Sequence, residues 1–389
     1  MSNIRLTLPA SMLVTFVLGS VHAFSVFIVP LETRLQLPRS EISLIYSFAL
    51  VALTLAVLLG YRIYGLLPSW LLVLITCLVA AAGLLLASLA TSWWMMFAGY
   101  SLAFGFSNGI GYGFCLQLVG RVMPEIRGFA MGAVTASYAV GSIVFAQVFA
   151  WRIAAESMQS ALLTIAVCLV GCGLLAASML RSAGASYGQP QVNGRQPDGI
   201  IDRARVLQFW LAYMTAVFAG LMAIGHAAGI ALSKDASIEL ATLAAITIGI
   251  GSALGGFVAG GLVDRWPVRR LLVGLPLIAA VALLLIGIAE GARVVVALLS
   301  LVGFSYGSII AVYPVAIAAC FGERGPQAYG QVFTAWGFAG LVAPWSAGLI
   351  YDLRAGYELA MVIAAVIAVL SALSVAFFRF EHIAEGRAD

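Results

Sequence analysis

Residues Arg181–Arg205, RSAGASYGQPQVNGRQPDGIIDRAR, form the only long polar run away from the ends of the chain. The run is rich in Gly, Pro, Ser and Gln and carries a surplus of Arg, a composition that buries too little apolar surface to fold by itself. We therefore predict a flexible cytoplasmic linker at 181–205. On each side of it lie six apolar runs of helical length. This arrangement predicts two halves, 1–180 and 206–389, joined by the linker.

The composition places the chain in a membrane. Of its 389 residues, 63% are hydrophobic and only 9% are charged, whereas soluble domains carry about 25% charged residues. The apolar runs continue for about 20 residues, the length of a transmembrane helix, and do not alternate over about ten residues as barrel strands do. The sequence therefore predicts an all-α polytopic membrane protein with twelve transmembrane helices in two six-helix halves. A water-soluble function such as cytosolic catalysis does not fit this composition.

The predicted spans alternate with short connections along the whole chain. They cover residues 8–30, 43–61, 70–90, 94–118, 128–150, 159–180, 206–232, 238–262, 270–289, 294–320, 328–350 and 357–378. The first apolar run is long and has no evident cleavage site, so we interpret it as a span and not as a signal peptide. Twelve spans place both termini on one side. If that side is the cytoplasm, it holds fourteen of the twenty basic residues, as the positive-inside rule requires. We predict a multi-pass protein of the inner (plasma) membrane with cytoplasmic termini.

The basic excess and the cysteines predict no further partners. A net charge of +4 in a membrane protein reports orientation and not nucleic-acid binding. The five cysteines lie within apolar runs without a neighbouring His or acid, so we interpret them as small hydrophobic residues. They are Cys77, Cys115, Cys168, Cys172 and Cys320. We expect no metal site and no cofactor, and the lipid bilayer is the expected surrounding.

One face of span four and one face of span eight carry a glycine at about every fourth residue. These glycines are Gly105, Gly109 and Gly113, and Gly251, Gly255, Gly256 and Gly260. Such faces let helix backbones approach closely where lipid gives no hydrophobic drive for packing. The pattern is typical of a rigid packing motif and equally of helices that slide or rock against each other.

The polar residues within the spans are few and uncharged at the span centres. No Asp, Glu, Lys or Arg lies near the middle of any span, so the buried ions that mark many ion pumps are missing. Amides, phenols, imidazoles and an indole remain, and near the bilayer midplane these groups need hydrogen-bond partners or a wet cavity. They are His22, Tyr46, Asn108, Tyr112, Gln117, Tyr138, Gln147, His226, Tyr306, Tyr313 and Trp336.

His22 and His226 lie in the first span of each half, at comparable depth. A single histidine in an apolar helix is as often a hydrogen-bonded packing residue as it is part of a site. Two histidines at near-corresponding places favour a shared central cavity. Asn108 and Tyr112 lie four residues apart on one helix face. Their side chains are interpreted either as interhelical hydrogen-bonding groups or as substrate contacts.

Charged residues gather at the ends of the spans. The run DRWPVRR places Asp264 opposite Arg265, Arg269 and Arg270 in a compact turn between spans eight and nine. An acid at a helix end that faces several arginines can act as a breakable cytoplasmic latch, which suits a two-state gate. The mixed-sign charges at residues 32–41 predict a solvated external loop instead.

The same turn carries a family likeness. Gly260-Gly261-Leu262-Val263-Asp264-Arg265, followed by Arg269-Arg270, resembles the loop signature of the major facilitator superfamily. In that family the signature occurs between spans two and three and again between spans eight and nine. The first copy in this chain, Gly60-Tyr61-Arg62-Ile63-Tyr64-Gly65, lacks the acid. The resemblance therefore implies the latch for the second copy only.

Within the superfamily the chain resembles the oxalate/formate antiporters and the related monocarboxylate transporters. Gly19–Phe27, GSVHAFSVF, resembles their first-span pattern, which usually has Tyr at the position of His22 and Trp at that of Phe24. Arg127–Gly132 resembles their entrance to span five. Span eleven and its exit resemble the family at Tyr329-Gly330, Phe333–Gly337, Pro344, Gly348 and Tyr351-Asp352. The likeness covers nearly the whole length.

The departures from this pattern bear on the substrate. The resemblance implies that an oxalate exchanger holds two carboxylates with one basic residue in span eight and another in span eleven. Span eight of this chain has no basic residue, and Trp336 stands at the position in span eleven. A dianion without buried cations would be badly desolvated, because a buried ion without its partner costs several kcal/mol. We therefore disfavour oxalate and expect a small monocarboxylate, or a neutral or apolar organic solute.

The hypothesis from the sequence is a secondary transporter that moves a small organic anion by alternating access, either coupled to protons or by exchange. The solute would lie near the bilayer midplane. Its predicted contacts are His22, Phe24, Asn108, Tyr112, Tyr138, His226, Tyr306, Tyr313 and Trp336. A protonated histidine would neutralise the carboxylate, whereas a neutral one would only donate a hydrogen bond.

Three rival functions stay open at this point. An exporter of apolar or neutral organic compounds would use the same fold and suit an aromatic cavity without buried cations. A non-transporting sensor or assembly partner would need a signalling domain, and the tail Phe380–Asp389 is short for one. A membrane enzyme fits least, because the span centres offer no acid, Lys or Arg and no Cys/His metal cluster.

Overall fold

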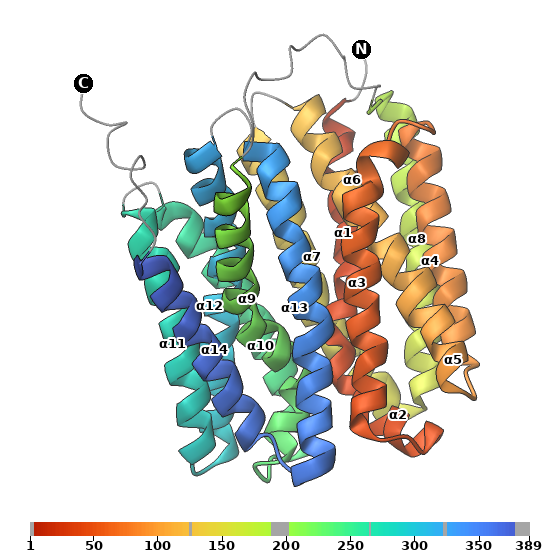
Figure 1. Cartoon of the computed structure of the whole chain (residues 1–389). Helices are drawn as coiled ribbons and strands as arrows, with labels where there is room; N and C mark the ends of the chain where they lie inside the picture. Colours follow the sequence, from red (N-terminus) through yellow and green to blue (C-terminus); the bar gives the residue numbers. More distant parts are fainter. Residues whose placement is uncertain (1–3, 124–126, 188–201, 264–265, 322–324, 378–389) are drawn as a thin grey trace, which may run out of the picture. The chain divides into compact units, whose positions relative to one another are not determined.

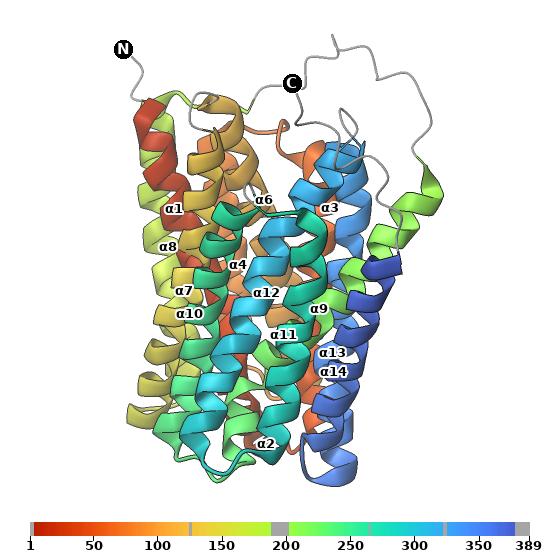
Figure 2. The same ribbon diagram turned by 90° about the vertical axis from the view of Figure 1, so that its left-hand side faces the viewer.

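The computed structural model of the chain describes residues 4–123, 127–187, 202–263, 266–321 and 325–377. Within these residues all regular secondary structure is helical. The chain divides into two compact units, unit 1 (Met1–Pro190) and unit 2 (Gln191–Asp389). In each unit the long helices run side by side as a bundle (Figures 1 and 2).

Unit 1 contains two spans that change helix type along their length. Span one consists of α1 (Thr7–Leu18), the 3₁₀ helix η2 (Gly19–Phe27) and α2 (Ile28–Leu35), and it follows a short 3₁₀ turn, η1 (Ile4–Leu6). Span four consists of α5 (Trp93–Met96), the π helix η3 (Phe97–Phe104) and α6 (Gly105–Val122). The other helices of this unit are α3 (Arg39–Ile63), α4 (Ser69–Ser88), α7 (Arg127–Ala155) and α8 (Met158–Ala183).

Unit 2 is built from α-helices without such changes of type in its described residues. They are α9 (Arg203–Leu232), α10 (Ile238–Leu262), α11 (Val268–Ile288), α12 (Ala292–Phe321), α13 (Gly325–Arg354) and α14 (Glu358–Phe377). Helix α9 packs against α13 and α14, and α11 packs against α12 and α14 (Figure 2). Asp202 begins α9, because its carboxylate accepts hydrogen bonds from the backbone N–H groups of Ala204 and Arg205.

Twelve helical segments in the described part of the chain are long and apolar enough to cross a membrane. The prediction of twelve transmembrane helices is therefore confirmed, and boundaries differ by a few residues, as in span two, predicted at 43–61 and found at Arg39–Gly60. Bulky apolar side chains lie on the outer surface: Phe257 is 85% exposed and Ile288 is 78% exposed. Such a surface is stable where lipid surrounds the helices.

Span one approaches α7 so closely that glycine is needed on both sides. A Cβ at Gly19 would lie 1.9 Å from the carbonyl oxygen of Tyr138, and a Cβ at Gly141 would lie 1.7 Å from the carbonyl oxygen of Phe16. The backbones therefore touch where α1 passes into η2. A 3₁₀ helix has about 3.0 residues per turn and an α-helix about 3.6, so the change of type at Gly19 redirects the side chains that follow it.

The charged residues between spans one and two form a clamp, which corrects the predicted solvated loop at 32–41. Arg39 donates from Nε and Nη2 to the two carboxylate oxygens of Glu32, at 2.5 and 2.6 Å. The side chain of Arg39 is only 7% exposed. Arg34 donates to the carbonyl oxygen of Ser88, at the end of α4. A bidentate pair of this kind fixes the geometry of the connection between α2 and α3.

The glycines of span eight bring two backbones together. On α10, a Cβ at Gly251 or Gly255 would lie 1.9 or 2.0 Å from a carbonyl oxygen of α12. On α12, a Cβ at Gly303 or Gly307 would lie 2.0 or 1.9 Å from a carbonyl oxygen of α10. Helix α6 approaches α3 in unit 1 by the same means. Each unit thus holds helices at a separation that only glycine permits.

Gly255→Ala tests this packing. The added methyl must displace the carbonyl of Phe304, and we expect overpacking of this kind to lower the free energy of unfolding by about 1–3 kcal/mol. Gly260→Ala on the same helix is the control, because no atom lies within 4 Å of the position of its Cβ. Alanine is the better helix former, so this control should stabilise by up to about 1 kcal/mol. The melting temperatures of both purified variants are measured by thermal unfolding in detergent. Equal melting temperatures for Gly255→Ala and Gly260→Ala would contradict the close packing of α10 on α12.

Candidate functional site

Six aromatic and polar side chains meet in unit 1, and we call them the His22 cluster. They are His22, Phe24, Tyr46, Asn108, Tyr112 and Tyr138. Spans one, two, four and five each supply at least one member. The five residues of this half that were predicted as substrate contacts all belong to the cluster, and Tyr46 joins them.

Asn108 holds the centre of the His22 cluster. Its Nδ2 donates to the carbonyl oxygen of Leu18 at 2.6 Å, and its Oδ1 accepts from the hydroxyl of Tyr138 at 2.9 Å. Leu18 is the last residue of α1, directly before the 3₁₀ segment. Asn108 is fully buried. Because both ends of its amide are bonded, Asn108 braces α1 and α7 against α6, and it satisfies a carbonyl at the change of helix type.

His22 is half-buried and is held on two sides. Its Nδ1 lies 2.9 Å from the hydroxyl of Tyr46, and its ring meets the ring of Tyr138 edge-on, with centroids 5.6 Å apart at 82°. Phe24 stacks on Tyr46 at 5.3 Å and 9°, and Tyr100 packs on Phe24. The ring of Tyr46 is thereby fixed, so its hydroxyl has a defined position from which to bond the imidazole.

Tyr112 completes the His22 cluster beside Tyr138. The two ring centroids are 4.8 Å apart, and the hydroxyl of Tyr112 lies 3.4 Å from Oγ1 of Thr135. Tyr112 is half-buried, as His22 is, whereas Asn108 and Tyr138 are buried. The accessible hydrogen-bonding groups of the cluster are therefore an imidazole nitrogen and a phenol. Such a pair can donate to one carboxylate, but it supplies no permanent positive charge for two.

His226 in unit 2 is enclosed instead. It is fully buried, its Nδ1 lies 2.9 Å from the hydroxyl of Tyr357, and its Nε2 lies 2.7 Å from the carbonyl oxygen of Pro344. A carbonyl only accepts, so Nε2 must carry the proton, and in the neutral ring Nδ1 then accepts from Tyr357. The ring joins α9 to α13 and to the start of α14, the arrangement expected of a packing histidine.

The remaining predicted contacts of unit 2 lie in two aromatic groups. Nε1 of Trp336 donates to the hydroxyl of Tyr306 at 2.8 Å, and Phe333 stacks parallel to Trp336 at 5.6 Å and 8°. Tyr313 is fully buried and packs on Tyr213, with ring centroids 4.5 Å apart. These contacts give unit 2 large apolar rings, of which Phe333 is half-buried and the others are buried.

The predicted latch falls partly outside the described residues. Asp264 and Arg265 lie in the gap at 264–265. Arg269 and Arg270 are exposed, and Nη2 of Arg269 donates to the carbonyl oxygen of Ala376 near the end of α14. A cation at a helix C-terminus is favourable, because the partial charge there is negative. The latch itself stays a prediction.

Sequence reasoning missed an anchor at the start of the polar run. Helix α8 ends at Ala183, and the chain turns at Gly184, with φ of 62°. Tyr187 then packs under the guanidinium of Arg121, with 3.9 Å between the Cζ of Arg121 and the ring centroid, and its hydroxyl donates to Oε1 of Gln117 at 2.5 Å. Burial raises the pKa of the Tyr187 phenol, against the opposing effect of Arg121, so the hydroxyl stays a donor. The only signal was an aromatic residue within a polar run.

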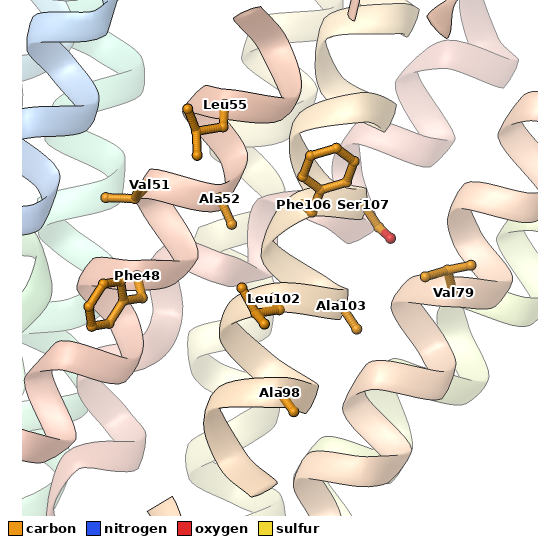
Figure 3. Close-up of a pocket in the computed structure, with 10 residues that line it drawn as sticks. All are labelled: Phe48, Val51, Ala52, Leu55, Val79, Ala98, Leu102, Ala103, Phe106 and Ser107. Atoms are coloured by element: carbon orange, nitrogen blue, oxygen red, sulfur yellow. The ribbon is translucent and has the colours of Figure 1, made fainter. Parts of the chain in front are cut away.

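An apolar groove of about 570 Å³ lies elsewhere on unit 1, among α3, α4, η3 and α6. Figure 3 shows side chains that line it, among them Leu55, Ala98, Ala103 and Phe106. Its lining residues include no charged side chain, so it suits hydrocarbon and not an anion. Among the described residues, no three His, Cys, Asp or Glu side chains group closely enough to hold a metal ion.

Comparison with known protein families and curated proteins agrees with the resemblance seen in the sequence. Residues 204–388 match the model of the Major Facilitator Superfamily. The chain is 24% identical over 358 residues to an uncharacterized MFS-type transporter, YhjX, of Escherichia coli K12, covering 86% of this chain and 85% of that protein. It is 23% identical over 363 residues to monocarboxylate transporter 13 of Rattus norvegicus, covering 90% of this chain and 82% of that protein. The resemblance to this superfamily and to its monocarboxylate transporters is thus confirmed.

Solved structures show the same fold. The nucleoside transporter NupG aligns with a TM-score of 0.74 at 14% identity, covering 97% of this chain and 100% of that chain. The xylose transporter XylE of Escherichia coli, in a partially occluded inward open conformation, aligns with a TM-score of 0.71 at 13% identity, covering 97% and 99%. At these identities the likeness concerns the fold alone.

The two histidines should respond differently to substitution. His226→Leu leaves the hydroxyl of Tyr357 and the carbonyl of Pro344 without their partner, and we expect a loss of about 2 kcal/mol or more in the free energy of unfolding. His22→Leu removes one bond from a half-buried ring and should cost about 1 kcal/mol or less. Melting temperatures of the purified variants decide this, and an equal or larger loss for His22→Leu would show that His22 is the packing residue.

Proposed function

We propose that this chain carries a small organic anion of the monocarboxylate kind across the membrane by alternating access. The family match over residues 204–388 and the relatives support a transporter of the Major Facilitator Superfamily type, and the fold agrees with this. Transporters of this type bind small-molecule substrates and are not enzymes. Two six-helix units are the parts that alternating access requires.

The observation that carries the proposal is the His22 cluster. Its one titratable nitrogen base lies half-buried among neutral donors, and the described helices place no acid or cation in contact with it. One negative charge can be held there by hydrogen bonds, and by a full charge when His22 is protonated. A second carboxylate would find no cation, which supports a monocarboxylate over oxalate. The relatives named monocarboxylate transporter 13 agree with this substrate class.

The residues of the proposed site have unequal roles. His22 and Tyr112 would contact the carboxylate, with Phe24 and Tyr138 as packing around them. Asn108 would hold the geometry. In unit 2 the contacts of Trp336, Tyr306 and Tyr313 with the solute stay proposed from the sequence alone, and the enclosure of His226 favours a structural role for that ring over substrate contact.

The orientation is part of the same proposal. Fourteen of the twenty basic residues would face the cytoplasm if both termini lie there, and this bias is the usual determinant of topology. We therefore place the chain in the inner (plasma) membrane, with the linker at 181–205 and the latch at Asp264–Arg270 on the cytoplasmic side.

A second candidate, export of apolar compounds, is favoured by one observation, the groove of about 570 Å³ on unit 1. Extrusion of a lipophilic dye from vesicles, without competition by short-chain acids, would select this function. Competition between a labelled monocarboxylate and unlabelled short-chain acids would select the first.

Uptake of labelled pyruvate or formate into proteoliposomes tests the proposed function. Protonated His22 attracts a carboxylate with a full positive charge, whereas neutral His22 only donates a hydrogen bond, so uptake should rise as the external pH falls. His22→Ala should lower uptake at acid pH by roughly tenfold or more, the value of one hydrogen bond to a charged group, and should flatten the pH profile. His382→Ala, which removes another of the three histidines, serves as the control. A normal pH profile in His22→Ala would refute the role of His22, and wild-type protein that takes up neither acid would refute the substrate class.

Counter-substrate inside the vesicles separates the two modes of coupling. Stimulation by an inward acid gradient indicates proton symport, and stimulation by internal monocarboxylate alone indicates exchange.

A further inference from the structure

Each unit contains a histidine–tyrosine pair in which the imidazole Nδ1 lies at the same distance from the phenol hydroxyl, although the angle between the rings differs, 78° in unit 1 and 56° in unit 2. In unit 1, Nδ1 of His22 lies 2.9 Å from the hydroxyl of Tyr46. In unit 2, Nδ1 of His226 lies 2.9 Å from the hydroxyl of Tyr357. Both histidines belong to the first span of their unit, whereas the tyrosines come from different places, α3 in unit 1 and the residue before α14 in unit 2. The pairs therefore differ in sequence context and agree in the atoms that they join.

The difference between the pairs is at the other ring nitrogen. Nε2 of His226 is bonded to the carbonyl oxygen of Pro344 at 2.7 Å, and the ring is fully buried. Nε2 of His22 has no bonded partner among the described residues, and the ring is half-buried. Nε2 is thus hydrogen-bonded in the histidine of unit 2, whereas in the histidine of unit 1 it has no hydrogen-bond partner among the described residues.

A phenol is suited to hold Nδ1 in both protonation states of the ring. It donates to Nδ1 when the imidazole is neutral, which leaves the proton on Nε2, and it accepts from Nδ1–H when the imidazole is charged. In both of these states Nε2 is a donor directed away from Tyr46, whereas in the other neutral tautomer Nδ1–H donates to the phenol and Nε2 carries no proton. A carbonyl in the place of the phenol would accept only, and it would force the neutral ring to present a bare Nε2, which repels a carboxylate.

The surroundings of Tyr46 keep its hydroxyl in place. Its ring is buried and stacked on Phe24 at 5.3 Å and 9°, and Phe24 is backed by Tyr100. The titratable groups that face His22 are Tyr46 from α3 and Tyr138 from α7, with Tyr112 behind Tyr138. No Asp, Glu, Lys, Arg or Cys of the described residues contacts the His22 ring, so Tyr46 is its one hydrogen-bonding partner there.

We propose that Tyr46 is a positioning residue that holds Nδ1 of His22, so that Nε2–H is presented as the donor to the carboxylate of the solute. The part of this inference that concerns the carboxylate rests on the proposed function, and the part that concerns the ring does not. Tyr46 itself does not touch the solute. In the pair His226–Tyr357, Nε2 is already bonded to a backbone carbonyl and is not free for a solute. This pair therefore serves as an internal control in the experiments.

Nitrogen NMR of the imidazole rings tests the positioning without any solute. The chain has three histidines, so ¹⁵N-histidine protein in detergent gives a spectrum that single substitutions can assign. Tyr46→Phe, which keeps the stacked ring, should move the Nδ1 signal of His22 and leave both signals of His226 unchanged. Tyr357→Phe should do the reverse. Tyr100→Phe is the matched control, because its hydroxyl donates to the carbonyl of Val21 and not to His22.

Uptake kinetics test the consequence for the solute. Tyr46→Phe should raise KM for labelled pyruvate by up to about tenfold, the value of one hydrogen bond, and shift the pH profile. Tyr100→Phe should change neither. In a His22→Ala background the same Tyr46→Phe change should have no further effect on KM, because the two residues act through one bond.

The outcomes separate the two levels of the inference. An Nδ1 signal of His22 that is not hydrogen-bonded in the wild type, or that does not move in Tyr46→Phe, overturns the positioning role, and the wild-type spectrum decides this even if the variant does not fold. An unchanged KM in Tyr46→Phe, in a protein that does transport pyruvate, overturns the link to the carboxylate. A shifted Nδ1 signal in a protein that transports no monocarboxylate supports the positioning and refutes the proposed substrate.

Discussion

Hydrocarbon offers no hydrogen bonds, and this constraint decides where the polar side chains of the spans lie. Asn108 is hydrogen-bonded to the carbonyl of Leu18 and to the hydroxyl of Tyr138. His226 is hydrogen-bonded to the hydroxyl of Tyr357 and to the carbonyl of Pro344. Each such group ties helices of one unit together, because its partners come from other helices. Other polar atoms of the described residues are not used in this way. Nε2 of His22 is one of them, which is why we connect it with a solute.

The two units share a scaffold and differ in detail. Each has a pair of helices in glycine-mediated backbone contact, α3 with α6 and α10 with α12. Each also has a first-span histidine bonded to a tyrosine. Unit 1 alone replaces part of spans one and four by 3₁₀ and π helix in the described residues. Departures of this kind often mark functional positions or hinges. The proposed function assigns the anion to unit 1, where these departures lie.

The features that follow from local pattern were predictable from the sequence. Twelve spans follow from run length and hydropathy, and close backbone packing by span eight follows from its glycine spacing, although the partner helix does not. The polar members of the His22 cluster could be picked out from the sequence, because polar residues in spans are rare, but Tyr46 was not among the predicted substrate contacts. The hydrogen-bond partnerships were not predictable, because Tyr46 lies 24 residues from His22 and Tyr357 lies 131 residues from His226. The enclosure of His226 depends on the backbone of Pro344, which leaves no trace in side-chain pattern.

The charged and polar residues at the ends of the helices show most plainly what sequence composition does not predict. Arg39 and Glu32 look like a solvated loop by composition, yet they form a bidentate pair with a buried guanidinium. Tyr187 looks like part of a flexible linker, yet it packs on Arg121. In both cases a tertiary contact outweighs what the local composition indicates, and such contacts are set by the packing of helices that are distant in sequence.

The measurement that tests the central claim most directly is equilibrium binding of labelled pyruvate to the purified protein at acid and at neutral pH. The wild type should bind one pyruvate per chain, more tightly at acid pH, and His22→Ala should lose both the tight binding and its dependence on pH. Binding by His22→Ala that matches the wild type, or no saturable binding of a monocarboxylate by the wild type, would contradict the claim that His22 holds the anion.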